Sequence, residues 1–132
     1  SDLVVRVIAG AYAGQRGPAR TVTPIELWDV TLAPHGELPI DLPADHTKMV
    51  LVRSGDALLD ERHALAANEL AQWPRGTARP RLRAGAQGCQ LLFLGGAPID
   101  EPVVGYGPFV MNTRAEIAQA VDDFHAGRMG SL

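Results

Sequence analysis

Four histidines are the side chains in this sequence best suited to bind a metal ion or transfer protons: His35, His46, His63 and His125. No two of them have the His-x-His or His-x3/4-His spacing that brings two imidazoles to one metal. The first three lie in predicted turns, and His125 lies on a predicted exposed helix face. We interpret all four as surface histidines. A rearranged site joining His46 with Glu61 or His63 is conceivable but has no motif behind it.

Four of the 12 Lys and Arg residues form the one basic cluster of the sequence: Arg75, Arg79, Arg81 and Arg83. In an extended segment residues 79, 81 and 83 share a face. Nucleic-acid binding would need interleaved aromatic residues and a basic domain, whereas the formal net charge is -3. We interpret the cluster as a solvated strand face, and we expect neither nucleic acid nor a membrane as a partner.

The single cysteine, Cys89, excludes an internal disulfide. It lies in the apolar run CQLLFL, where a buried, unreactive thiol is expected. The sequence has no signal peptide and no apolar run long enough to span a bilayer. We therefore expect a cytoplasmic, reducing setting.

Length and periodicity predict how these residues are positioned. The 132 residues fit one domain, 1–132. Short extended segments separated by turn signals at 54–56, 60–62 and 74–76 indicate an all-β sandwich or barrel over residues 3–94. The expected strands are 3–8, 25–32, 37–42, 49–52, 57–59, a short strand around Leu70 within 65–73, and 90–94. Trp28 and Trp73 lie on strands and are expected in the core or at a domain interface.

One helix is expected, at 113–127. Thr113 and Glu116 form a capping box at its start, and Gly127 ends it. One apolar stripe follows at helical spacing: Ile117, Ala120, Val121 and Phe124.

Between the last strand and this helix lies GGAPIDEPVVGYGPFVMN, residues 95–112. Its prolines and glycines exclude a helix or a central strand, while its apolar residues favour burial. We predict a loop that covers one end of the barrel. A catalytic loop is the weaker interpretation, because no base accompanies Asp100 and Glu101.

The turn spacing resembles that of cupins, whose second motif is G-x5-P-x-G-x2-H-x3-N. Counted from Asn68, the P-x-G element falls on Pro74-Arg75-Gly76. The histidine position of the motif then falls on Arg79, and the asparagine position on Arg83.

The first cupin motif, G-x5-H-x-H-x3/4-E-x6-G, can be counted back from Gly55. Its glutamate position falls on Lys48, and its two histidine positions fall near Leu42 and Ala44. Protonated lysine and arginine have no lone pair for a metal. The resemblance therefore implies a cupin-type double-stranded β-barrel (jelly roll) with a C-terminal helix and no metal of the usual type. If Lys48 and Arg79 both point inward, a small anionic ligand is an alternative occupant.

The C-terminal part then resembles one family closely. EPVVGYGPFVMNT, followed by a helix of pattern E-I-x-Q-A-x-x-D-F-x-x-G-R-M-G, is similar to the end of pirin proteins. The residues that carry this likeness in the first segment are Glu101, Pro102, Gly105, Tyr106, Gly107, Pro108, Phe109, Met111 and Asn112. VRVIAG and LLFLGGAPIDEPVV also look like that family.

Pirins are bicupins, so the resemblance implies that iron or another divalent metal belongs to an N-terminal cupin, while the C-terminal cupin lacks ligands. Quercetin dioxygenation and transcriptional co-regulation are the functions it implies for the family. This sequence matches only the second domain, so we assign no catalytic, cofactor-binding or metal-binding residue.

Three functions remain as hypotheses. The first is a metal-free module that packs against an N-terminal pirin-type cupin or forms a homo-oligomer, and is not an enzyme by itself. The second is a quercetin 2,3-dioxygenase-like oxidoreductase. The third is an anion-binding barrel that uses Lys48 and Arg79.

Overall fold

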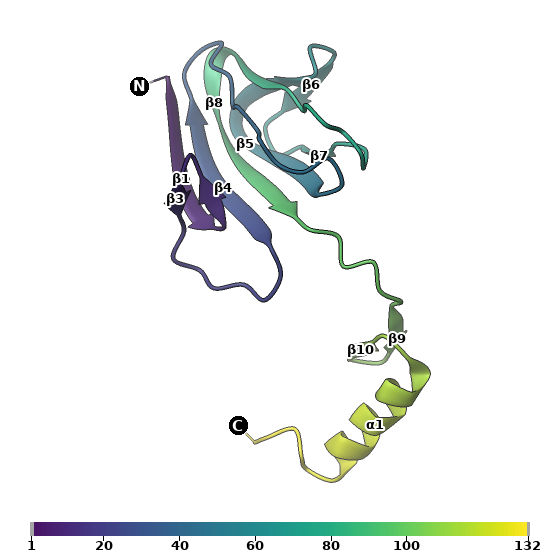
Figure 1. Cartoon of the computed structure of the whole chain (residues 1–132). Coiled ribbons are helices and arrows are strands. Elements are labelled where there is room, and N and C mark those ends of the chain that lie inside the picture. Colours follow the sequence, from purple (N-terminus) through teal and green to yellow (C-terminus); the bar gives the residue numbers. More distant parts are fainter. Residues whose placement is uncertain (1, 132) are drawn as a thin grey trace. The chain divides into compact units, whose positions relative to one another are not determined.

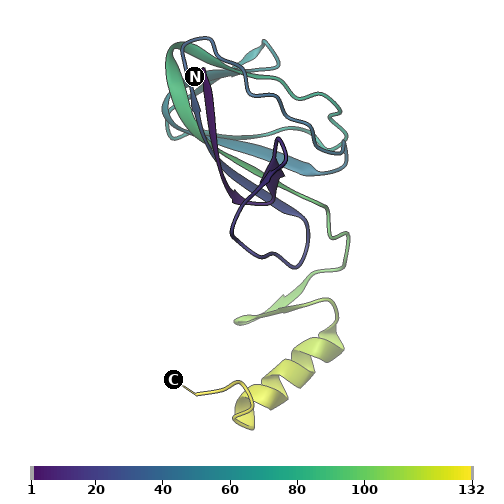
Figure 2. The same ribbon diagram turned by 60° about the vertical axis from the view of Figure 1, so that its left-hand side comes forward.

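The chain forms two compact units, which divide after Pro98. We describe residues 2–131 in a computed structural model (Figure 1). The first unit is a strongly curved antiparallel sheet (Figures 1 and 2) of order β1-β4-β8-β5-β6, with β7 paired to β5. Its strands are β1 Leu3–Ala9, β4 Ile25–Leu32, β5 Thr47–Leu59, β6 His63–Ala66, β7 Leu70–Gln72 and β8 Leu82–Gly96, and a small separate hairpin joins β2 Ala11–Tyr12 to β3 Gln15–Arg16.

Side chains alternate along the long strands, so every second one points to the same face of the sheet. The core of this unit lies on the concave face. On β4 the buried residues are Trp28, Val30 and Leu32, every second residue from Trp28 onward. Aromatic rings fill the centre. Trp28 stacks on Phe93 at 4.5 Å between ring centroids, and Trp73 lies 6.4 Å from Phe93.

The turn predicted at Ser54–Asp56 is wrong. β5 continues through these residues, and its pairing with β8 shifts register between Val52 and Ser54 and again between Gly55 and Ala57. Gly55 has a φ of +74°, and a Cβ there would lie 2.1 Å from the Gly88 carbonyl oxygen. The glycine therefore marks a β-bulge in a long strand rather than a chain reversal.

Three other strand predictions need correction. Residues 37–42 form no strand: only an isolated bridge joins Glu37 to Arg83, and Pro39 cannot donate to a ladder. The short strand predicted around Leu70 within 65–73 is β7, but the structure adds an unpredicted strand before it, β6, with a turn between the two at Asn68, whose φ is +69°. The strand predicted at 90–94 is part of the 15-residue strand β8, which begins earlier, at Leu82.

The second unit contains a hairpin and the helix. The segment 95–112 is not a loop throughout, since β8 extends to Gly96 and β9 Val104–Tyr106 pairs with β10 Phe109–Met111. Gly107, with a φ of +56°, allows the tight turn between them. That the segment 95–112 covers one end of the barrel stays a prediction.

The helix α1 Arg114–His125 confirms the sequence prediction. Both halves of the capping box are present: the Glu116 amide donates to the Thr113 hydroxyl, and the Glu116 carboxylate accepts from the Thr113 amide. Gly127, with a φ of +70°, follows the C-cap Ala126. Within the described residues no helix is long and apolar enough to cross a membrane.

Candidate functional site

Lys48 is the one charged side chain that is fully buried among the described residues, at 1% exposure. It lies on the core side of β5, two residues before Val50. Its Nζ donates to three backbone carbonyl oxygens, those of Pro43 at 2.7 Å, His46 at 3.2 Å and Ala44 at 3.4 Å. Burial lowers the pKa of this ammonium, while the negative charge of Asp45 acts to raise it. The lysine thus points inward, and its three hydrogen bonds to backbone oxygens and the negative charge of Asp45 stabilise the ammonium.

Arg79 does not share this environment, because its side chain is exposed. The three donors of the Lys48 ammonium face carbonyl oxygens, which would repel an anion placed beside them. The hydrogen-bond partners of Lys48 are backbone carbonyls of the segment 43–46 rather than an acidic side chain. This geometry gives the anion-binding alternative no support.

The other positions of the cupin motifs also carry no metal ligand. Arg83 points away from the core and pairs with Glu61 at 2.7 Å, whereas its neighbours Leu82 and Ala84 are buried. Strand alternation thus turns Leu82 and Ala84 into the core and Arg83 away from it, although Arg83 occupies the asparagine position of the motif. In the part of the chain that the structure describes, no three His, Cys, Asp or Glu side chains gather as a metal site would require. The residues at these positions do not suit the divalent metal of the fold family.

Two carboxylates that the sequence analysis did not single out hold the buried tryptophans. Glu26 Oε2 accepts from the Trp28 indole at 3.0 Å and from the Ala11 amide at 2.8 Å. Asp60 accepts from the Trp73 indole through Oδ2 at 3.0 Å and from the Arg81 amide through Oδ1 at 2.8 Å. Buried indole N–H groups need acceptors, but their identity depends on contacts between residues far apart in sequence.

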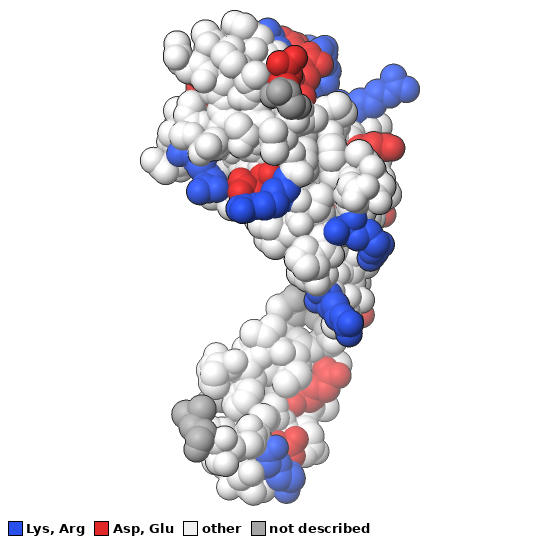
Figure 3. Space-filling view, turned by 90° about the vertical axis from the view of Figure 1, so that its left-hand side faces the viewer, with Lys and Arg blue, Asp and Glu red and all other residues white. Residues whose placement is uncertain are grey.

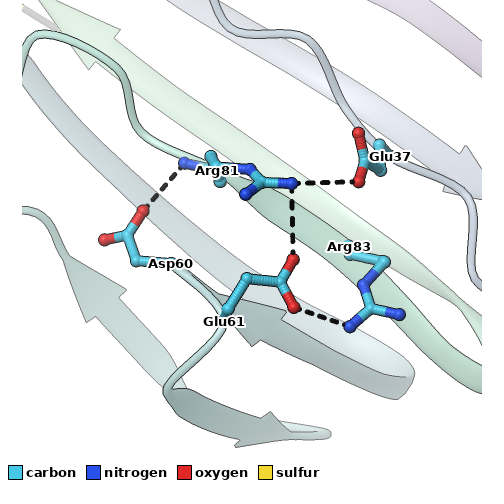
Figure 4. Close-up of polar contacts among 5 residues, drawn as sticks. All are labelled: Glu37, Asp60, Glu61, Arg81 and Arg83. Atoms are coloured by element: carbon cyan, nitrogen blue, oxygen red, sulfur yellow. Dashed lines mark hydrogen bonds and ion pairs between the residues drawn. The ribbon is translucent and has the colours of Figure 1, made fainter.

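Two members of the arginine cluster, Arg81 and Arg83, pair with acids from other segments (Figure 4). The Arg81 guanidinium lies 3.5 Å from Glu37 and 3.6 Å from Glu61, and Glu61 also binds Arg83. These side chains are largely exposed, so each pair contributes little stability. On the face that Figure 3 shows, basic and acidic side chains are interspersed over a mostly uncharged surface. The cluster is thus a mixed surface network rather than a basic patch.

Cys89 is buried, as expected. Burial, with a smaller contribution from the charge of Asp56, raises the pKa of its thiol to about 11. A thiol that stays protonated near neutral pH is a weak nucleophile. The residue therefore packs in the core and is not a catalytic candidate.

The C-terminal unit exposes most of the apolar side chains that were expected to be buried. Six large ones are at least half exposed: Ile99 (65%), Val103 (79%), Tyr106 (71%), Val110 (66%), Phe124 (61%) and Met129 (50%). Ile117 and Ala120 on α1 are buried, so the helix uses only part of its apolar stripe within the unit. So much exposed apolar surface on a short segment is typical of a surface that binds another protein element.

Comparison with known families agrees with this organisation. The model of the pirin C-terminal cupin domain matches residues 27–130. The chain belongs to the pirin family.

The pirin relatives are longer than this chain. "Putative quercetin 2,3-dioxygenase PA2418" of Pseudomonas aeruginosa is 44% identical over 124 residues, which cover 94% of this chain and 43% of the relative. "Pirin-like protein 2" of Arabidopsis thaliana is 33% identical, covering 96% of this chain and 41% of that protein. A crystal structure of quercetin 2,3-dioxygenase from Acinetobacter baumannii superposes with a TM-score of 0.81 at 37% identity, covering 96% of this chain and 44% of that one. The chain thus spans less than half the length of these pirin-related proteins and has their cupin fold.

Within this pirin domain, the segment that carries the family likeness is braced to the helix. Asn112 donates its side-chain amide to the Pro102 carbonyl at 2.8 Å, and its backbone amide donates to Glu116 at 3.0 Å. Phe109 lies against Phe124, with ring centroids 6.4 Å apart. The segment therefore forms a small ordered unit and leaves Tyr106 exposed beside it.

Proposed function

We propose that this chain is a metal-free interaction domain of a pirin-type protein. In this proposal its C-terminal unit docks on a metal-bearing cupin domain, and in isolation on a second copy of itself. The observation that carries the proposal is the set of exposed apolar side chains between Ile99 and Met129. Two further facts support it: the relatives are more than twice as long as the matched region, and Lys48 stands where the cupin motif places a ligand.

The surface can be tested by adding one charge at a time. Val103→Asp and Val110→Asp place a carboxylate on the C-terminal unit, where the valines are 79% and 66% exposed. Each should weaken association by about tenfold or more, because a charge at an apolar interface must be desolvated without a partner. Sedimentation velocity over a concentration series measures self-association, and titration with a separately produced pirin N-terminal cupin measures binding between domains.

The matched control is Val22→Asp, which adds the same charge to a fully exposed valine of the first unit. It should leave both associations unchanged. A wild-type chain that stays monomeric and also fails to bind the cupin domain would overturn the interaction proposal. So would an equal loss of binding in the Val22 variant.

A dioxygenase is the second candidate, favoured by the names of two relatives. The residues at the ligand positions do not suit iron, copper or nickel, so we expect substoichiometric metal in the purified chain and no turnover of quercetin. Elemental analysis and an oxygen-uptake assay check this. Stoichiometric metal that is lost together with activity on chelation would instead support the dioxygenase.

A further inference from the structure

The sequence has 12 Lys and Arg residues, and only one of them is lysine. That lysine, Lys48, is also the fully buried charge of the described chain, whereas most of the arginines lie at the surface. The exposed basic side chains of this protein are therefore arginines, and its one lysine occupies a buried position. Arginine offers a planar fork of five donors, while lysine offers a compact point charge with three.

The surroundings of Lys48 suit such a point charge. Its three N–H donors meet three carbonyl oxygens, those of Pro43, Ala44 and His46, at 2.7 to 3.4 Å. All three acceptors come from the four-residue segment 43–46, which wraps around the ammonium. Backbone oxygens gathered around one positive centre are the environment that proteins build for a hard cation.

Lys48 and the residues just before it align with the ligand positions of the first cupin motif. Lys48 stands at the glutamate position, and Leu42 and Ala44 stand near the two histidine positions. Leu42 brings no donor atom, and Ala44 contributes only its backbone oxygen. We propose that the Lys48 ammonium is a covalently attached cation that takes the place of the metal ion in this barrel. The inference rests on the metal-free part of the proposed function.

The attached cation would have the structural task of holding one end of the barrel together. Ala44 O, besides accepting from Lys48, accepts from the Gly76 amide at 2.9 Å, and the Trp73 amide donates to Lys48 O at 3.0 Å. Segment 43–46, the turn at 74–77 and the start of β5 therefore meet at this lysine. Loss of the ammonium would leave three carbonyl oxygens turned toward an empty interior position.

The single lysine makes a direct test possible in the wild-type protein. Acetylation by sulfosuccinimidyl acetate, followed by mass spectrometry of peptides, has only the N-terminal amine and Lys48 as amine targets. We expect the N-terminus to react in the native protein and Lys48 to react only after unfolding in urea. Reaction of Lys48 in the native state at the rate of a free lysine would overturn the proposal.

Burial alone would also protect Lys48, so a second test addresses the cation itself. Lys48→Ala removes the equivalent of propylammonium from the carbonyl cage, and Lys48→Met fills the space without a charge. Both variants should melt at lower temperature than the wild type. Propylammonium should raise the melting temperature of Lys48→Ala in a saturable way, whereas tetramethylammonium at equal ionic strength, which has no N–H donor, should not.

Lys48→Met is the control that stays informative if Lys48→Ala does not fold. It should gain nothing from propylammonium, because its side chain occupies the site. A Met variant as stable as the wild type would overturn the proposal, as would equal responses of the Ala variant to both cations. Metal analysis of the wild type separates this inference from the proposed function. Stoichiometric bound metal would overturn both the metal-free state and the replacement of the metal by Lys48, whereas a metal-free protein whose Lys48 reacts like a free lysine would overturn only the replacement.

Discussion

Replacing Phe93 by alanine is expected to destabilise the β-unit by about 3–5 kcal/mol, the largest effect of any single substitution considered. Phe93 is 0% exposed, stacks on Trp28 and lies with its ring centroid 6.4 Å from that of Trp73. Truncation leaves a cavity between two rings that are fixed by their own hydrogen bonds, so neither can move to fill it. For a unit of this size the melting temperature should fall by more than about 12 °C.

Thermal and urea unfolding followed by tryptophan fluorescence measure this effect, because both tryptophans border the cavity. Phe93→Leu retains apolar volume and should cost less than the alanine variant, the difference reporting the cavity. Phe124→Ala is the matched control, since it removes the same ring from a residue that is 61% exposed on the C-terminal unit. A Phe93→Ala protein that unfolds like the Phe124→Ala protein would refute this account of the core.

The elements that could be predicted from sequence are those set by local chemistry. Strand β4 was expected at 25–32 and lies at Ile25–Leu32, because its alternation and flanking residues are unambiguous. The helix was expected at 113–127, because the Thr113–Glu116 capping box and Gly127 mark its two ends. The family resemblance was also available, since the segment from Glu101 to Asn112 and the helix that follows carry most of it.

The features that could not be predicted from sequence depend on contacts between residues far apart in the chain. The segment 54–56 has the composition of a turn, but Gly55 lies in a β-bulge. Strand β8 pairs with this part of β5, and the backbone of Gly55 approaches that of Gly88 closely. Lys48 was recognised as standing at a ligand position, but its partners are backbone oxygens, which have no sequence signature. Tyr106 and Val110 are exposed although their apolar side chains favour burial, and the partner surface proposed above would account for both.

Asp60 is the carboxylate whose loss should affect the first unit most after the core substitutions. It occupies the tip of the β5–β6 hairpin with a φ of +50°. Its side chain binds the Trp73 indole and the Arg81 amide, and its own amide donates to the Arg81 carbonyl at 2.9 Å. One residue thus joins the hairpin tip, a buried tryptophan and the chain that leads into β8.

Asp60→Ala is expected to destabilise the unit by about 2–4 kcal/mol. The substitution leaves the Trp73 indole N–H and the Arg81 amide without their acceptor, and hydrogen bonds to charged groups are worth roughly 1.5–3 kcal/mol. Alanine also tolerates a positive φ poorly. Asp60→Asn separates the two causes, because asparagine accepts this backbone conformation but offers one acceptor oxygen instead of two. It should therefore fall between the wild type and the alanine variant.

A double-mutant cycle with Trp73→Phe isolates the indole bond. Phenylalanine keeps most of the ring volume but has no N–H, so Asp60→Ala should cost less in that background than in the wild type. The coupling free energy from urea unfolding should lie in the range of about 0.5–3 kcal/mol that contacting residues show. Glu61→Ala is the control: its pairs with Arg81 and Arg83 are exposed, so its loss should cost no more than about 1 kcal/mol. If Asp60→Ala and Trp73→Phe were additive, the carboxylate would not hold the tryptophan, and the aromatic core would be positioned by packing alone.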